Sequence, residues 1–262
     1  MSCDQTPPGA AASVTPSRVA TALCAMLVML LLGHAWSLVM IHVYGRDQVL
    51  SLVPLLHFDR EQNLPTFAAV LLLLGNSCLL ALNRSASSSP QQSGWGLLSI
   101  AFAFLALDEF ASLHERLDGM MRLFLMDGAE HHGVWVLPYA AVGLAFAATG
   151  FGWWRRLDAR TRWLSAAAGG LYVGGALGME AAASLLAMTG EPVTAGEASL
   201  AADLLVTIEE TAELGGAALF LWTLVDRLAR CGSGAIVFAN CVTPFASPSS
   251  QSAANPAFEP EK

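Results

Sequence analysis

The chain has 262 residues, of which 55% are hydrophobic and only 13% are charged, and its mean hydropathy is +0.53. Soluble domains carry about 25% charged residues, so this composition excludes a single soluble domain and a disordered scaffold. Thirteen Lys and Arg against 21 Asp and Glu give a net charge of -8, which excludes a basic surface for nucleic acid. The composition indicates a protein whose main partner is the lipid bilayer.

Six apolar stretches are long enough to cross a membrane, whose core of about 30 Å requires roughly 20 helical residues. They cover roughly 20–43, 65–82, 95–117, 134–154, 163–188 and 204–225. Segments rich in polar residues, Pro or Gly separate them, as expected at a membrane surface. We therefore predict an all-α fold, a polytopic transmembrane bundle of about six helices over residues 18–230. The second stretch is the shortest and the third is the most polar.

The positions of the basic residues predict the orientation. With six spans both termini share a side, and that side carries Arg18, Arg84, Arg155, Arg156, Arg160, Arg162, Arg227, Arg230 and Lys262. The opposite side carries only Arg46, Arg60, Arg116 and Arg122. Because cytoplasmic loops are enriched in Lys and Arg, we expect a multi-pass protein of a bacterial inner (cytoplasmic) membrane with both termini in the cytoplasm.

The two ends of the chain differ in composition from the spans. Residues 1–17 form a polar leader without a charged start, and no Ala-x-Ala cleavage site follows the first apolar run, so we expect no cleaved signal peptide. Residues 231–262 are rich in Ser, Pro, Ala and Asn and are predicted to be a disordered tail. The five cysteines form no C-x-x-C pair, which favours neither a disulfide framework nor a zinc–thiolate site.

Seven carboxylates interrupt the apolar stretches. They are Asp108, Glu109 and Glu115 in the third stretch, Glu180 in the fifth, and Glu209, Glu210 and Glu213 in the sixth. An ionised side chain at the bilayer centre costs about 2.5–3.5 kcal/mol, so seven facing lipid would cost on the order of 20 kcal/mol. That exceeds the net stability of a typical domain. These carboxylates must therefore face one another, water or a cation.

Helical geometry places these side chains in one layer. At 100° per residue, Asp108 and Glu115 are about 20° apart, and the three glutamates of the sixth stretch share one face. Gly215 and Gly216, like the glycines before Glu180, favour close helix packing. With the orientation above, most of the carboxylates and His34 lie about 9–15 Å below the outer surface, while His114 and Glu115 lie about 3–5 Å below it. Helices running in opposite directions thus deliver their polar groups to the same level.

A purely structural role competes with this interpretation. Protonated carboxyls hydrogen-bonded between helices would explain one or two such residues, but not seven at one depth. His114 is either an interfacial residue or a ligand or proton carrier, and His34 is equally open. His131 and His132 are best interpreted as solvated. Crowded carboxylates raise one another's pKa and do not all ionise without a cation.

Three functional classes fit, and a metal-dependent membrane enzyme, a hydrolase or an oxidoreductase, ranks first. Carboxylates and imidazole suit a divalent ion such as iron, manganese or zinc. The expected metal ligands are Asp108, Glu109, Glu180, Glu209, Glu213 and His34, and the expected catalytic or supporting residues are His114, Glu115 and Glu210. A lipid or another amphiphile is the expected substrate. The Glu-x-x-His motif of ferritin-like di-iron bundles is absent, which disfavours that version.

The second class is a proton- or cation-coupled transporter that uses the same carboxylates. The small size, the lack of an internal repeat and the few broken helices speak against it, although a homo-oligomer would compensate for size. The third class, a non-catalytic sensor or assembly factor, has no specific feature in its favour.

The segment Leu107-Asp108-Glu109, followed after four residues by His114-Glu115-Arg116, resembles an LDE-x4-HER pattern. With Glu180 and the Glu209-Glu210-x-x-Glu213 helix downstream, it is similar to a group of bacterial multi-span membrane proteins without an assigned activity. The resemblance covers about residues 20–228 and implies a membrane bundle, with no reaction and no residue roles.

Overall fold

The computed structural model describes residues 15–114, 116–117, 119–120, 136–179, 182 and 200–231. Every regular element in these residues is helical, which confirms the predicted all-α fold. The elements are α1 (Pro16–His42), η1 (Val49–Ser51), α2 (Leu52–Leu56), α3 (Leu64–Ser85), α4 (Ser89–Ala111), α6 (Val136–Trp154), α7 (Ala159–Val173), the π-helical η2 (Gly174–Met179) and α9 (Leu200–Arg230). Residues 1–14 of the predicted leader and residues 232–262 of the predicted tail lie outside the described residues.

Local capping chemistry explains where several helices begin. A proline stands in the first turn of α1, α3 and α4, where its missing N–H leaves no helical hydrogen bond unmade. The Asn63 side chain accepts a hydrogen bond from the Thr66 backbone N–H at 3.1 Å and starts α3. The Asp158 carboxylate does the same for Thr161 at 3.0 Å and starts α7. Each helix thus begins at a polar break of the sequence.

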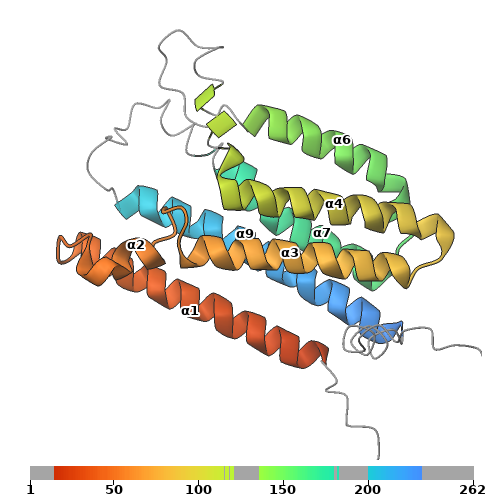
Figure 1. Cartoon of the computed structure of the whole chain (residues 1–262), viewed down its shortest axis with the longest axis horizontal. Coiled ribbons are helices and arrows are strands. Elements are labelled where there is room, and N and C mark those ends of the chain that lie inside the picture. Colours follow the sequence, from red (N-terminus) through yellow and green to blue (C-terminus); the bar gives the residue numbers. More distant parts are fainter. Residues whose placement is uncertain are drawn as a thin grey trace, which may run out of the picture.

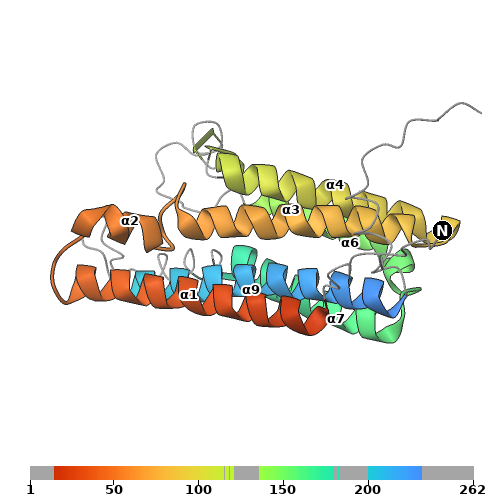
Figure 2. The same ribbon diagram turned by 60° about the horizontal axis from the view of Figure 1, so that its bottom comes forward.

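The helices form two layers. Figure 2 shows α3, α4 and α6 in one layer and α1, α9 and α7 in the other. The most extensive packing joins α3 with α4 and α7 with α9, and the layers meet mainly where α3 crosses α9. The indole N–H of Trp222 near the end of α9 donates to the backbone oxygen of Pro16 at 3.1 Å. The start of α1 and the end of α9 therefore lie at the same end of the bundle (Figure 1).

Four of the described helices, α1, α3, α4 and α6, are long and apolar enough to cross a membrane. They indicate a membrane protein. The predicted number of six spans is not confirmed, because α7 has only 15 residues before the π-helical turn and α9 carries several carboxylates. The shortest and the most polar of the predicted stretches are among the four, since α3 extends to 22 residues and α4 to 23.

The two ends of the bundle differ in charge. At the end where α1 begins and α9 ends, which we call the basic end, Arg160 pairs with Asp226 and Arg230 pairs with both Asp226 and Asp158. Burial alone would raise the pKa of Asp158, but its hydrogen bonds to Thr161 and the charge of Arg230 lower it below the ordinary value. At the opposite end, which we call the acidic end, α1 and α4 end and α3 and α9 begin.

Two glycines allow α9 to approach the α7–η2 segment closely. A Cβ atom on Gly175 would lie 2.9 Å from the backbone oxygen of Glu209. A Cβ atom on Gly216 would lie 2.7 Å from the backbone oxygen of Ala168 and 2.7 Å from the backbone nitrogen of Tyr172. The predicted close packing is therefore present at these two positions, and it brings the acidic turns of α9 against α7.

Substitution of Gly216 by Ala is expected to destabilise the bundle. The added methyl group meets backbone atoms that cannot turn aside, so we expect a cost of about 1–3 kcal/mol. The matched control is Gly143→Ala on α6, where a Cβ atom has nothing within 4 Å and helix propensity favours Ala by up to about 1 kcal/mol. Thermal unfolding of both variants in detergent measures the difference. Equal melting temperatures for the two variants would contradict this packing.

Candidate functional site

The polar residues near the acidic end form three neighbouring groups. We call them the acidic cavity (Glu109, Tyr172, Glu210 and Glu213), the Asp108 group (Asp108, His114 and Tyr139) and the histidine cluster (His34, His42, His57, Asp203 and Thr207). The sequence predicted a single layer of ligands. The structure divides those residues among separate contacts.

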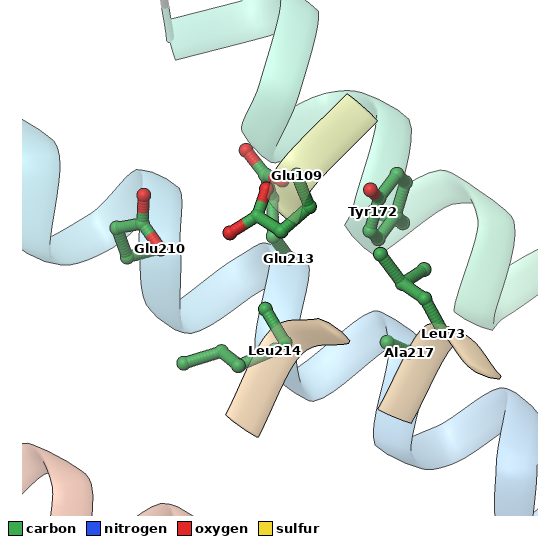
Figure 3. A pocket seen from close by; sticks show the side chains of 8 residues that line it. Leu73, Glu109, Tyr172, Glu210, Glu213, Leu214 and Ala217 are labelled. Carbon is green, nitrogen blue, oxygen red and sulfur yellow. The ribbon is translucent and has the colours of Figure 1, made fainter. Parts of the chain in front are cut away.

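The acidic cavity lies between three helices. Glu109 comes from α4, Tyr172 from α7, and Glu210 and Glu213 from successive turns of α9, as Figure 3 shows. Apolar side chains complete the lining, namely Ala69, Leu73, Leu214 and Ala217. The cavity has a volume of about 10 Å³, which is close to the minimum that holds one water molecule. The structure thus brings together three of the predicted carboxylates around a space suited to one water or one monatomic ion.

Glu209 has a different position from its two neighbours on α9. Its backbone oxygen faces Gly175 of η2, and the Glu213 Cγ atom would lie 3.0 Å from a Cβ atom on that glycine. Glu209 is absent from the lining of the acidic cavity. The absence of a side chain at position 175 therefore makes room for Glu213 to reach the cavity between α7 and α9.

The Asp108 group forms where α4 ends. Ser112 has left-handed backbone angles, with φ of 46°, so the helix ends at Ala111 rather than continuing to residue 117 as expected. The Asp108 Oδ1 atom accepts hydrogen bonds from the His114 backbone N–H at 3.0 Å and from the Tyr139 hydroxyl at 2.8 Å. Its Oδ2 atom lies 3.4 Å from Nδ1 of His114.

This turn corrects the helical placement predicted for the third stretch. The helix of Asp108 ends at Ala111 instead of continuing to residue 117, and Glu115, which was predicted to share its face, lies outside the described residues. Asp108 is directed to His114 and α6, whereas the next residue, Glu109, lines the acidic cavity. Asp108 therefore lies outside the lining of the acidic cavity, and its role as a metal ligand stays a prediction.

His114 is suited to carry a proton. Burial disfavours its charged form, but the hydrogen bond to Asp108 and the charges of Asp108, Glu109 and Glu61 outweigh that effect and raise its pKa above the ordinary 6.5. Protonated His114 is thus stabilised by the fold, as the role of proton carrier requires.

His114→Gln is expected to change how stability depends on pH. Because the pKa in the folded state is raised, His114 contributes stability that is fully present below the ordinary pKa of 6.5 and is lost as the pH rises through the folded-state pKa. The melting temperature of the wild type should therefore fall over this window, and that of the variant should fall less. Melting curves in detergent across the window test this, and equal slopes would contradict it.

Both ring nitrogens of His34 are engaged. The Phe58 backbone N–H donates to Nδ1 at 3.1 Å, so the neutral ring carries its proton on Nε2, which lies 2.8 Å from the Thr207 hydroxyl. The Thr207 hydroxyl in turn donates to the backbone oxygen of Asp203 at 2.6 Å. In this arrangement neither ring nitrogen of His34 offers a lone pair to a metal ion, and its role as a ligand stays a prediction.

Sequence reasoning missed His42, His57 and Asp203. The Nε2 atom of His42 lies 2.6 Å from Oδ2 of Asp203, and the Nε2 atom of His57 lies 3.8 Å from Oδ1 of the same carboxylate. These residues stand at the ends of spans or between them, where polar side chains are usually solvated. One feature of the sequence could have indicated them: the segments that carry His42, His57 and Asp203 are all predicted to reach the same membrane surface.

The predicted metal centre is not tested by these contacts. Within the described residues, no group of three or more His, Cys, Asp or Glu side chains is arranged to hold a metal ion. Glu115 and Glu180, a supporting residue and a ligand in the prediction, lie outside the described residues, as do His131 and His132. A centre of iron, manganese or zinc stays a prediction.

Residues 20–228 match a family that is described as a domain of unknown function, DUF8692. The match covers all but the first residues of α1 and the last residues of α9. No curated protein and no solved structure matches the chain. The resemblance to proteins with the LDE-x4-HER pattern stays a prediction, because the family description names no motif.

Proposed function

The chain belongs to the DUF8692 family, and because that description assigns no activity, we propose a function from the chemistry of the acidic cavity. The proposal is a proton- or cation-coupled membrane transporter whose coupling ion binds among Glu109, Glu210 and Glu213. The sequence ranks this class second, and the size and lining of the acidic cavity support it.

The observation that carries this proposal is the size of the cavity together with its lining. Three carboxyl groups and the Tyr172 side chain surround about 10 Å³, which suits a water molecule or a monatomic cation and excludes an organic substrate. Carboxylates at such close quarters do not all ionise unless a cation lies among them. Within a membrane, ionisable groups of this kind mark the paths of ions and protons. A bound proton or monatomic cation therefore fits the volume of the cavity and balances the negative charge of its carboxylates.

The charges at the two ends support an orientation. The described arginines of the basic end are Arg18, Arg84, Arg155, Arg156, Arg160, Arg162, Arg227 and Arg230, against Arg46, Arg60 and Arg116 at the acidic end. By the positive-inside rule the basic end faces the cytoplasm. The acidic cavity then lies in the outer half of an inner-membrane protein with both termini in the cytoplasm. A reporter enzyme that works only in the periplasm, fused to the C-terminus, should be inactive. Activity of this fusion would contradict the orientation.

Ion flux through proteoliposomes tests the proposed function. An imposed gradient of protons or of Na⁺ should dissipate faster with the wild type than with empty liposomes. Glu213→Gln should reduce the faster flux by about tenfold or more, since it removes a group that binds the ion. The matched control is Asp47→Asn, because Asp47 is an exposed acid at the same end of the bundle. Wild-type fluxes of both ions equal to those of empty liposomes would overturn the proposal.

A second observation favours an enzyme that acts on an amphiphile. An open groove of about 320 Å³ is lined by Leu113, Arg116, Leu117, Met120 and Tyr139. The Tyr139 hydroxyl also binds Asp108, whose carboxylate holds His114. An imidazole oriented by a carboxylate is a common arrangement for general acid–base catalysis. The apolar wall suits an acyl chain, and Arg116 suits an anionic head group.

Metal analysis distinguishes this enzyme from the transporter. A metal-dependent form of this enzyme, with Glu109 as a ligand, predicts a stoichiometric transition metal in the purified wild type that is lost in Glu109→Gln, with Asp47→Asn unchanged. Background metal in all three proteins would remove the support for a metal-dependent enzyme.

A further inference from the structure

We propose that His42, Asp203 and His57 form a proton-exchange site through which protons move between the outer aqueous phase and the acidic cavity. This inference rests on the proposed function, and it adds the place where the ion enters. The three residues come from the end of α1, the start of α9 and the segment between α2 and α3.

The two oxygens of Asp203 face two imidazole rings. His42 contacts Oδ2 through Nε2 at 2.6 Å, and His57 faces Oδ1 through Nε2 at 3.8 Å. The side chain of His42 is 18% exposed, whereas those of Asp203 and His57 are 10% and 5% exposed. His42 is therefore the member that contacts water, and histidine is the side chain best suited to exchange protons near neutral pH.

His57 identifies the ligand of this site as a proton rather than a metal ion. Its Nδ1 atom accepts a hydrogen bond from the Asp59 backbone N–H at 3.3 Å, so the neutral ring carries its proton on Nε2. That Nε2 atom is buried and has no hydrogen-bond partner among the described residues. A metal ion would need a lone pair on Nε2 and a proton on Nδ1, which would then oppose the N–H of Asp59.

The transfer follows from these tautomers. His42 takes a proton from water on Nδ1 and passes its Nε2 proton along the 2.6 Å contact to Oδ2 of Asp203. The histidine is then neutral again, with its proton on Nδ1, and Asp203 is a neutral carboxylic acid. The N–H of His57 faces the other oxygen of Asp203.

The route continues along one stripe of α9. Asp203, Thr207 and Glu210 stand at i, i+4 and i+7, within about 60° of one another and over a rise of about 10 Å. The Thr207 hydroxyl lies between them, and the Thr211 hydroxyl on the next turn is buried without a hydrogen-bond partner in the described part of the chain. A buried hydroxyl of this kind is suited to bind the water that carries a proton to Glu210.

The charged and titratable groups around Asp203 come from two neighbouring elements. They are His34 and His42 on α1, and His57, Asp59 and Arg60 in the segment before α3. Burial lowers the pKa of His57 below the ordinary value, although Asp203 opposes this effect. His57 therefore stays neutral and acts as a hydrogen-bond donor. The charges of Asp59 and Arg60 have opposite signs and oppose each other. The proton that moves is shared by His42 and Asp203.

The rate of proton exchange tests this inference, and the number of bound protons tests the proposed function beneath it. A stopped-flow pH jump on the purified protein, followed with a pH-sensitive dye, gives both quantities. His42→Gln and Asp203→Asn should slow uptake by the acidic cavity by about tenfold or more. Glu213→Gln should instead lower the number of protons taken up above the usual carboxyl range. Asp47→Asn should match the wild type in both.

The outcomes separate the two claims. An unchanged proton count in Glu213→Gln overturns the proton-coupled form of the proposed function, and the exchange site with it. A reduced count there, with wild-type rates in His42→Gln and Asp203→Asn, overturns the exchange site alone. Imidazole added to His42→Ala should restore the rate of proton uptake, which it would not do if His42 had only a structural role. Failure of this rescue in a folded variant counts against the inference.

Discussion

Replacement of Arg227 by Ala is expected to cost about 3–5 kcal/mol of stability, more than any other single change considered at the basic end. Arg227 on α9 is only 7% exposed. Its Nη1 atom donates to the Asn83 side chain at 2.6 Å and its Nη2 atom donates to the Ser87 hydroxyl at 3.1 Å. The guanidinium carbon lies 4.6 Å from the centre of the Trp95 ring. Truncation removes two charge-assisted hydrogen bonds and a buried cation–π contact, and it leaves the Oδ1 atom of Asn83 without its donor in the core.

The matched control is Arg156→Ala, because Arg156 is exposed at the same end and surface substitutions usually change stability by less than about 0.5 kcal/mol. Arg227→Lys should recover part of the loss, since it keeps the charge but not the two-pronged geometry. Denaturant titration in detergent measures all three. If Arg227→Ala unfolds at the same denaturant concentration as Arg156→Ala, the buried arginine does not stabilise the packing of α9 against α3 and α4.

The second large effect has the opposite sign. Glu213→Gln should stabilise the protein at neutral pH, although it removes a group that binds the ion. A carboxyl that keeps its proton at pH 7 costs about 1.4 kcal/mol for each pH unit above its value of about 4.3 in the unfolded chain. Glutamine is neutral at every pH and avoids this cost. The gain should therefore shrink as the pH falls toward about 4, where the unfolded chain is protonated as well.

The wild type and Glu213→Gln are compared by melting temperature at several pH values, with Asp47→Asn as the control. A gain that disappears at low pH supports a proton in the acidic cavity. A loss of stability in Glu213→Gln at neutral pH would contradict it and would favour the metal ion of the enzyme alternative, since removing a ligand destabilises a metal site.

The all-α membrane fold and the acidic cavity could be predicted from the sequence because both follow from local rules. Apolar runs of helical length specify the spans. The cost of isolated charges in lipid predicts that carboxylates of different helices meet, although not that Glu109, Glu210 and Glu213 are the three that line the cavity. Small residues at positions 175 and 216 mark where α9 approaches α7. None of these inferences depends on how the segments between helices fold.

The remaining features depend on tertiary contacts. The left-handed turn at Ser112 ends α4 within an apparently continuous helical pattern, and it is accompanied by the hydrogen bonds that Asp108 makes to His114 and Tyr139. The span count differed because α9 combines a helix of 31 residues with a row of acids. Such a helix is too polar for a simple span, yet it forms the polar side of the cavity.

The histidine cluster could not be predicted for a related reason. His57 lies in a short segment whose path is fixed by the backbone hydrogen bonds of Phe58 and Asp59 to two histidine rings. No periodic sequence pattern predicts such contacts. Some of them join residues that are distant in sequence, and the others lie in segments outside the helices. Only the assembled bundle shows that His42 and His57 face one carboxylate.

Infrared difference spectroscopy during a pH titration tests the central claim most directly, because it detects protonated carboxyl groups themselves. The account predicts a protonated carboxyl band near neutral pH in the wild type, retained in Asp47→Asn and lost or reduced in Glu213→Gln. If every carboxyl of the wild type is ionised above about pH 6 in the absence of added cations, the glutamates of the cavity do not share a proton and the account is contradicted.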